Sequence, residues 1–284
     1  MAREVIIFFI GIFLLTQVLG LYIGSKYINL IKAMPELQPQ LFPGVSPQSI
    51  ENSIFLLFYI LAITVVIILV IRFKKILLRG IEAVAIFFAS LITFDFLFPI
   101  AIFSIPVSIF LSLGLTSWKM LRPSVLNQNL AVIFSVSGVG AFLGVSLGIL
   151  PVLVFIILLS FYDFISVFVT KHMIYIAKEI AKTPTAFSAA FPYKFKKPVY
   201  FVVGSKRVKR HYQLGGGDIA IPLMFSVSVL REFTFYHTVF SMLGAVASLC
   251  LITYFVTKKH IALPALPWIS SGMLIGFLIS AITI

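Results

Sequence analysis

The chain has 284 residues, of which 61% are hydrophobic and 11% are charged, and its mean hydropathy is +1.13. This composition excludes an ordinary soluble domain, which is about half apolar and a quarter charged, and it predicts an all-α polytopic membrane protein. The net charge of +13 would suit a nucleic-acid partner, but most basic residues lie in short segments between apolar runs. We therefore assign the charge to membrane topology and expect no nucleic acid to bind.

Nine apolar segments are long enough to be transmembrane helices rather than barrel strands. The third and fourth segments are separated only by a tight turn near Phe98-Pro99, and the fifth and sixth meet near Pro151. The first segment follows Arg3 and lacks an obvious small-residue cleavage site, which predicts an uncleaved span rather than a signal peptide. In chain order the nine segments cover residues 5–24, 52–71, 80–97, 99–117, 129–148, 150–170, 212–230, 233–256 and 263–283.

The distribution of basic residues predicts the orientation of these nine segments. With the N-terminus inside, 19 of the 22 Lys and Arg residues fall in inside segments, and only Lys26, Lys32 and Arg231 fall outside. This alternation follows the positive-inside rule and predicts nine transmembrane helices with the N-terminus inside and the C-terminus outside. We expect a multi-pass integral protein, of the cell membrane if its source is prokaryotic.

Two connecting segments are longer than turns. Residues 25–51, outside, contain four prolines and are expected to form an irregular or interfacial loop. Residues 172–211 form a basic inside loop, which is either a solvated linker or a gating or substrate-contacting element. Within this loop, 172–182 could extend the sixth helix, and 199–210 is strand-like. The loop divides the chain into 1–171, with helices one to six, and 212–284, with helices seven to nine.

Two of the nine acidic residues, Asp163 and Asp218, lie deep in apolar segments. Glu82 lies near the predicted inner surface, where we expect it to snorkel or to form an ion pair, and Asp95 lies near the outer end of the third segment. Asp163 and Asp218 lie within the sixth and seventh segments, where an ionised carboxylate is costly. The remaining acids are at helix ends or in loops: Glu4, Glu36, Glu51, Glu179 and Glu232.

The spacing of Asp163 and Asp218 places them at the same depth. Asp163 lies eight positions before Lys171, and Asp218 lies eight positions after Arg210. At a helical rise of 1.5 Å per residue, each is roughly 12 Å from the basic inner boundary. The sixth segment runs inward and the seventh runs back, so we predict the two carboxylates at the same depth on helices that are adjacent in sequence.

A pair of close carboxyl groups has a characteristic chemistry. Two such groups share one proton, because both cannot ionise cheaply. The ionised member can take a proton from water that attacks a carbonyl carbon, and the protonated member can polarise that carbonyl and protonate the leaving amine. The alternative is that Asp163 and Asp218 are unrelated buried acids, each satisfied by hydroxyls or backbone groups. Intramembrane acids usually line a water-filled path, which favours the pair.

Glycine and proline residues loosen the backbone near both ends of the predicted site. Gly215-Gly216-Gly217 precede Asp218 and leave room for another backbone to approach, or they simply permit close helix packing. Pro222 weakens the turn after Asp218. Pro264 and Pro267, at the inner start of the ninth segment, leave backbone groups free, with which an unwound substrate could pair as an added strand.

Three motifs now give the sequence a resemblance to a known family. They are a Tyr-Asp pair in segment six, a Gly-x-Gly-Asp sequence in segment seven and a Pro-Ala-Leu sequence that opens segment nine. In this order and at these spans, they resemble the presenilin and signal-peptide-peptidase family of intramembrane aspartyl proteases, here as a microbial member. The residues are Tyr162-Asp163, Gly215-Gly216-Gly217-Asp218 and Pro264-Ala265-Leu266.

The resemblance implies that Asp163 and Asp218 are catalytic and that the other motif residues shape the site and bind substrate. These are Tyr162, Gly215, Gly216, Gly217, Pro264, Ala265 and Leu266. It implies that the substrates are transmembrane helices of proteins in the lipid bilayer and that the reaction needs neither a metal nor a cofactor. The sequence after Asp218 is closer to signal peptide peptidase, whereas the predicted orientation is that of presenilin. The sequence therefore does not decide between these two branches of the family, and it does not indicate the oligomeric state.

Other functions fit the sequence less completely. Gly144-Val145-Ser146-Leu147-Gly148 matches the G-x-S-x-G nucleophile pattern, but all four histidines lie at segment ends or in loops. Gly140, Gly144 and Gly148 are also spaced for close helix packing. The sequence contains no H-E-x-x-H motif, which a zinc protease of that type would need. A prepilin-peptidase-like enzyme would share the Gly-x-Gly-Asp motif but not the Pro-Ala-Leu motif. The main alternative is a proton- or ion-coupled transporter that uses the same paired acids.

Overall fold

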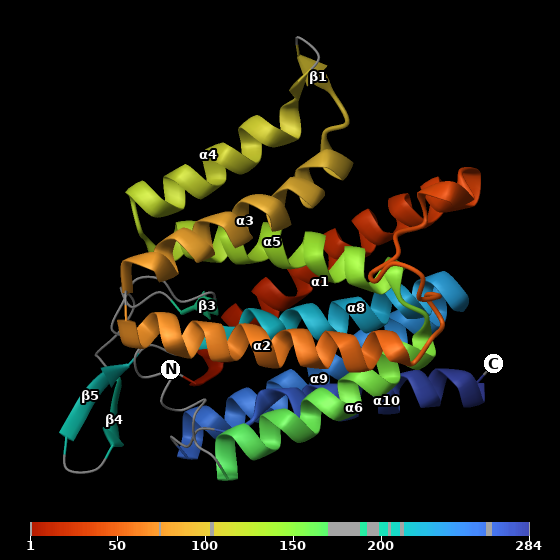
Figure 1. Cartoon of the computed structure of the whole chain (residues 1–284). Coiled ribbons are helices and arrows are strands. Elements are labelled where there is room, and N and C mark those ends of the chain that lie inside the picture. Colours follow the sequence, from red (N-terminus) through yellow and green to blue (C-terminus); the bar gives the residue numbers. More distant parts are fainter. Residues whose placement is uncertain are drawn as a thin grey trace.

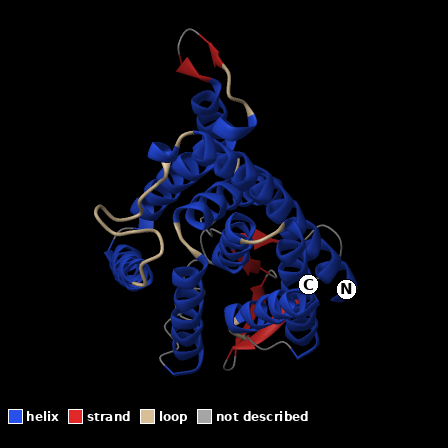
Figure 2. Cartoon of the chain, turned by 90° about the vertical axis from the view of Figure 1, so that its right-hand side faces the viewer, coloured by secondary structure: helices blue, strands red, loops and turns tan. Residues whose placement is uncertain are grey.

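The computed structural model describes residues 2–73, 75–102, 105–169, 188–191, 199–203, 206–210, 213–259 and 263–283. Within these ranges the chain is mostly helical, and its strands are short (Figures 1 and 2). The helices lie side by side in a bundle, with the N- and C-termini near opposite ends (Figure 1).

Nine α-helices are found in the described residues, and each overlaps one predicted apolar segment. Seven of them are long and apolar enough to cross a membrane, with α6 counted together with its π-helical continuation to Val169; α4 and α8 have fewer than 18 residues. The all-α prediction is confirmed at this level, and the nine-span count stays a prediction. The helices are α1 (Ala2–Ala33), α2 (Glu51–Phe73), α3 (Lys75–Leu97), α4 (Val107–Leu121), α5 (Val125–Ser146), α6 (Ile149–Phe164), α8 (Gly216–Glu232), α9 (Phe235–Lys259) and α10 (Ala265–Thr283).

Two of the predicted boundaries are wrong because of a proline. Helix α1 continues to Ala33, although a loop was expected from residue 25. It ends just before Pro35, which begins a short 3₁₀ turn (Pro35–Leu37), because a proline disfavours helix in the residue that precedes it. The fourth helix begins at Val107 rather than at Pro99, because Pro106 has an extended backbone and serves as its N-cap.

The third and fourth helices are joined by more than a tight turn. A small hairpin lies between them, with β1 (Ala101–Ile102) antiparallel to β2 (Ile105–Pro106). The expected join between the fifth and sixth helices is confirmed, since α5 ends at Ser146 and α6 begins at Ile149.

Two further two-stranded sheets are formed by residues in or beside the predicted inside loop. The strand-like prediction for 199–210 is confirmed, because β4 (Val199–Val203) pairs antiparallel with β5 (Lys206–Arg210). A second sheet joins β3 (Ser188–Ala190) to β6 (Gln213–Gly215). The predicted helical extension over 172–182 lies outside the described residues.

Small residues let α5 pack closely on α8. Gly140 contacts Leu223, and Gly144 contacts both the Met224 carbonyl group and Val227. A side chain at either glycine would displace α8, so the packing interpretation of these two residues is confirmed. Ser146, the centre of the nucleophile-like pattern, is buried, and its hydroxyl donates to the Phe142 carbonyl oxygen at 2.7 Å.

Helices α9 and α10 form a second close pair. Gly244 lies against the backbone of Gly272, and Gly276 lies against the backbone of Phe240. Such small residues allow helix backbones to approach within a membrane, where van der Waals packing drives helix association. This pairing fixes α10, which carries the Pro-Ala-Leu motif at its start.

Candidate active site

Asp163 is the penultimate residue of α6, where the helix widens. The next five residues, Ile165–Val169, form a π-helical turn, and the Ile165 N–H is shared between the carbonyl oxygens of Phe161 and Tyr162. The Ser166 hydroxyl donates to the Asp163 carbonyl oxygen at 2.9 Å. π-helical turns are rare and are frequent at functional sites.

Asp218 lies in the first turn of α8, three residues after the N-cap, Gly215. Its carboxylate faces the backbone N–H of Gly215, which is the contact that an acid at this position makes in a capping box. A Cβ atom at Gly215 would lie 3.0 Å from Asp218 Oδ2, so the missing side chain leaves room for the carboxylate. Gly217 has no neighbour within 4 Å of where its Cβ would be.

The Pro-Ala-Leu motif lies where α10 begins. Helix α10 starts at Ala265, directly after the buried Pro264, and its second residue is the buried Leu266. The backbone N–H of Leu266 faces the Asp163 carboxylate. First-turn N–H groups have no partner within their own helix, and the positive end of the helix dipole favours a carboxylate. The first turn of α10 is therefore satisfied by an acid from α6.

The structure brings the three motifs together. Helices α6, α8 and α10 contact one another in every pairwise combination, and the carboxylates of Asp163 and Asp218 are close enough for their charges to interact. Both side chains are partly exposed rather than sealed in the core. Each carboxylate thus has a backbone N–H at a helix start as a partner and the other acid as a neighbour.

The remaining motif residues surround the pair. Tyr162 and Ala265 are partly buried and pack against the main apolar core, and Gly216 is buried. Asp95 lies outside this group: it is exposed, and its Oδ1 accepts a hydrogen bond from Ser108 of α4 at 3.2 Å. No cluster of three or more His, Cys, Asp or Glu that could hold a metal is found among the described residues.

Sequence reasoning missed the strand that leads into Asp218. Residues 212–215 were expected to be helical, but Gln213–Gly215 form β6, and α8 begins only at Gly216. Gly215 has an extended backbone, with φ −61° and ψ 141°. The π-helical turn after Asp163 was also missed, because neither feature has a local sequence signal stronger than the apolar pattern around it.

Comparisons with known proteins agree on one family. The family model described as signal-peptide peptidase, presenilin aspartyl protease matches residues 10–284. Two solved structures of presenilin-family intramembrane aspartate proteases share the fold. The first, in space group C222, has a TM-score of 0.65 and 22% identity over 97% of this chain and 96% of its own. The second, in space group P2, has a TM-score of 0.64 and 24% identity over 95% of this chain and 97% of its own. A search of curated proteins finds no match.

A helical membrane bundle that brings two carboxylates together suits an intramembrane aspartic protease, and the family match decides the class. The chain belongs to the signal-peptide peptidase and presenilin family of aspartyl proteases. It is accordingly an aspartic endopeptidase and a multi-pass integral membrane protein with a presenilin-like fold. The resemblance seen in the sequence is confirmed, and the transporter alternative receives no support.

Proposed function

We propose that this protease hydrolyses peptide bonds within transmembrane helices of other membrane proteins, with Asp163, Asp218 and water as the reacting groups. The observation that carries the proposal is the convergence of the two carboxylates at the contact of α6, α8 and α10. Partial exposure of both acids leaves them accessible to water and substrate.

The proposed reaction uses one proton shared by the pair. The ionised carboxylate takes a proton from water as the water oxygen attacks the carbonyl carbon, while the protonated carboxyl donates to the carbonyl oxygen. The tetrahedral diol then collapses, the C–N bond breaks, and the amine leaves with a proton from the pair. The N–H groups of Gly215 and Leu266 hold the two carboxylates in place throughout.

The other motif residues bind and shape the substrate in this proposal. The open space beside Gly217 admits a substrate backbone close to Asp218. Backbone groups around Pro264 could pair with a substrate that has unwound into extended form. Scission is slow, because the substrate helix must unwind and water must reach the carboxylates inside the membrane.

We also propose that nine helices span the membrane, with the N-terminus inside, and that cleavage takes place in its inner half. The positions of the two termini at opposite ends of the bundle support an odd number of crossings (Figure 1). Helices α4 and α8 would then be the shortest spans. In a prokaryotic source this would be the cell membrane. The orientation favours substrate spans with an outside N-terminus.

The test is cleavage of a single-span reporter reconstituted with the full chain in liposomes. We expect two fragments whose new termini lie within the apolar segment, identified by mass spectrometry. An aspartyl protease inhibitor that mimics the tetrahedral intermediate should block their formation. Intact reporter together with proton or ion flux through the same liposomes would contradict the proposal and would favour transport.

A further inference from the structure

The turn that carries Asp218 begins in a strand. Gly215 is both the last residue of β6 and the N-cap of α8, so no residue separates the strand from the helix. In β6, Gly215 is opposite Ser188 of β3, and Gln213 is opposite Ala190. Since the Gly215 N–H faces the Asp218 carboxylate, the position of β3 determines the position of a direct partner of that carboxylate.

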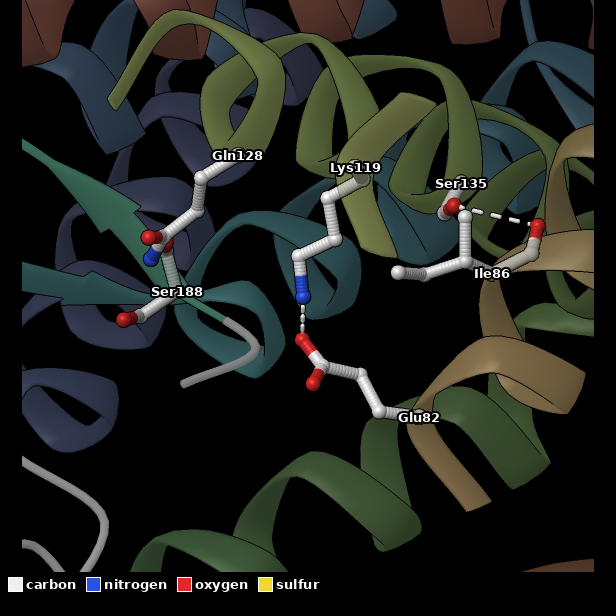
Figure 3. A network of polar contacts seen from close by, with 6 residues as sticks. All are labelled: Glu82, Ile86, Lys119, Gln128, Ser135 and Ser188. Atoms are coloured by element: carbon white, nitrogen blue, oxygen red, sulfur yellow. Dashed lines mark hydrogen bonds and ion pairs between the residues drawn. The ribbon is translucent and has the colours of Figure 1, made fainter. Parts of the chain in front are cut away.

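Side chains of α5 bind the backbone of β3. The Asn129 side chain donates from Nδ2 to the Ala190 carbonyl oxygen at 3.0 Å, and its Oδ1 accepts from the Ala190 N–H at 2.8 Å. The preceding residue, Gln128, donates from Nε2 to the Ser188 carbonyl oxygen at 2.6 Å. In Figure 3 the Gln128 side chain extends from α5 toward Ser188.

These contacts lie on the edge of β3 that faces away from β6. In an antiparallel pair, alternate residues direct their backbone groups to the partner strand and to the opposite edge. Ser188 and Ala190 both direct backbone groups to α5, which leaves the intervening Ala189, opposite Leu214, to face β6. The side chains of α5 thus occupy the place of a third strand.

An amide is the side chain suited to this place. It offers a donor and an acceptor in one plane, as a peptide group does, and Asn129 uses both on a single residue. Asn129 and Ala190 are 8% and 6% exposed, so loss of the amide would leave buried backbone groups without partners. A sheet of three residues in each strand is too short to persist without such support.

We propose that Asn129 is a positioning residue for the protease: by fixing β3, and through it β6, it holds Gly215 where its N–H meets the Asp218 carboxylate. Asn129 itself lies on α5 and acts through the sheet. The consequence for catalysis rests on the proposed function, whereas the consequence for β6 does not.

The same helix turn offers a matched control. Asn127 is 3% exposed, two residues before Asn129, and its Nδ2 donates to the Arg122 carbonyl oxygen at 2.8 Å. This bond stabilises the connection between α4 and α5 and has no part in binding β3. Replacement of Asn127 therefore removes a buried amide of the same kind without removing the support of the sheet.

The test compares Asn129→Ala, Asn129→Asp and Asn127→Ala in the purified full chain. Two readouts are used: hydrogen exchange of the β6 amides, followed by mass spectrometry, and kcat and KM for a single-span reporter. We expect both Asn129 variants to exchange about tenfold faster at β6 and to lose about tenfold in kcat, with KM nearly unchanged. Asn129→Asp keeps the acceptor but sets a carboxylate oxygen against the Ala190 carbonyl oxygen. Asn127→Ala should keep wild-type values of exchange and kcat.

Wild-type exchange at β6 in folded Asn129→Asp would overturn the proposal, as would equal effects of Asn127→Ala. If Asn129→Ala does not fold, Asn129→Asp, which preserves size, decides. Failure of the wild-type protein to cleave any reporter would count against the proposed function, and the exchange measurement would still decide whether Asn129 supports β6.

Discussion

Gly215 and Gly217 belong to the same turn but have different surroundings. At Gly215 an added Cβ would lie 3.0 Å from Asp218 Oδ2, closer than carbon and oxygen normally approach, whereas at Gly217 it would meet nothing within 4 Å. Both residues are typical of a site where backbones approach closely. The first glycine thus leaves room for the carboxylate, and the second leaves room for a substrate.

Alanine substitutions should separate these two effects. Gly215→Ala should leave KM nearly unchanged and lower kcat by about tenfold or more, because small displacements of a reacting group are costly. Gly217→Ala should fold at least as stably as the wild-type protein but should raise KM, because its methyl group enters the substrate's space. Steady-state kinetics and thermal unfolding measure both. Identical kinetics for the two variants would contradict this division.

At the scale of elements, an ion pair joins α3 to α4 within the bundle. Glu82 and Lys119 pair with side chains that are only 6% and 4% exposed (Figure 3). Of the two alternatives expected for Glu82, snorkelling or an ion pair, the structure shows the ion pair. A buried pair adds little net stability over apolar residues, but removal of one partner leaves an uncompensated charge.

Glu82→Gln should therefore destabilise the fold by about 3–5 kcal/mol. The double variant Glu82→Gln/Lys119→Met should recover most of that loss, because no buried charge remains. Denaturant unfolding in detergent, followed by tryptophan fluorescence, measures the free energy of unfolding. A single variant as stable as the wild-type protein would show that the pair is not buried in solution.

At the scale of the whole molecule, the sequence predicts the helices well, because membrane spans need long apolar runs. Each of the nine predicted segments contains a helix in the described residues. Two of the errors fall at Pro35 and Pro106, where a proline decides the boundary more sharply than hydropathy does. Asp163 and Asp218 were found because intramembrane acids are rare.

The rest of the site could not be predicted, because it depends on long-range pairing. Strands β3 and β6 have three residues each, and 22 residues, which include the β4–β5 hairpin, separate them in the sequence. The role of the Asn129 amide becomes visible only when the fold brings the Ala190 backbone within hydrogen-bond distance of it. Nothing in a helical sequence pattern distinguishes such an asparagine from one that faces solvent.

The orientation of the chain can be tested with single cysteines in a Cys250→Ser background. Gln40→Cys lies in the predicted outside loop, and Arg122→Cys lies in a predicted inside connection; both positions are exposed. In intact cells a membrane-impermeant maleimide should label only the first, and permeabilisation should expose the second. The reverse pattern would contradict an inside N-terminus.

The most direct test of the account is the rate of reporter cleavage by Asp163→Asn and Asp218→Asn in the same liposomes as the wild-type protein, with folding verified by thermal unfolding. If the two carboxylates act as one unit, each single change should lower the rate about a thousandfold or more, and the double variant should be no worse than either. Cleavage at the wild-type rate by either folded variant would contradict the shared-proton mechanism.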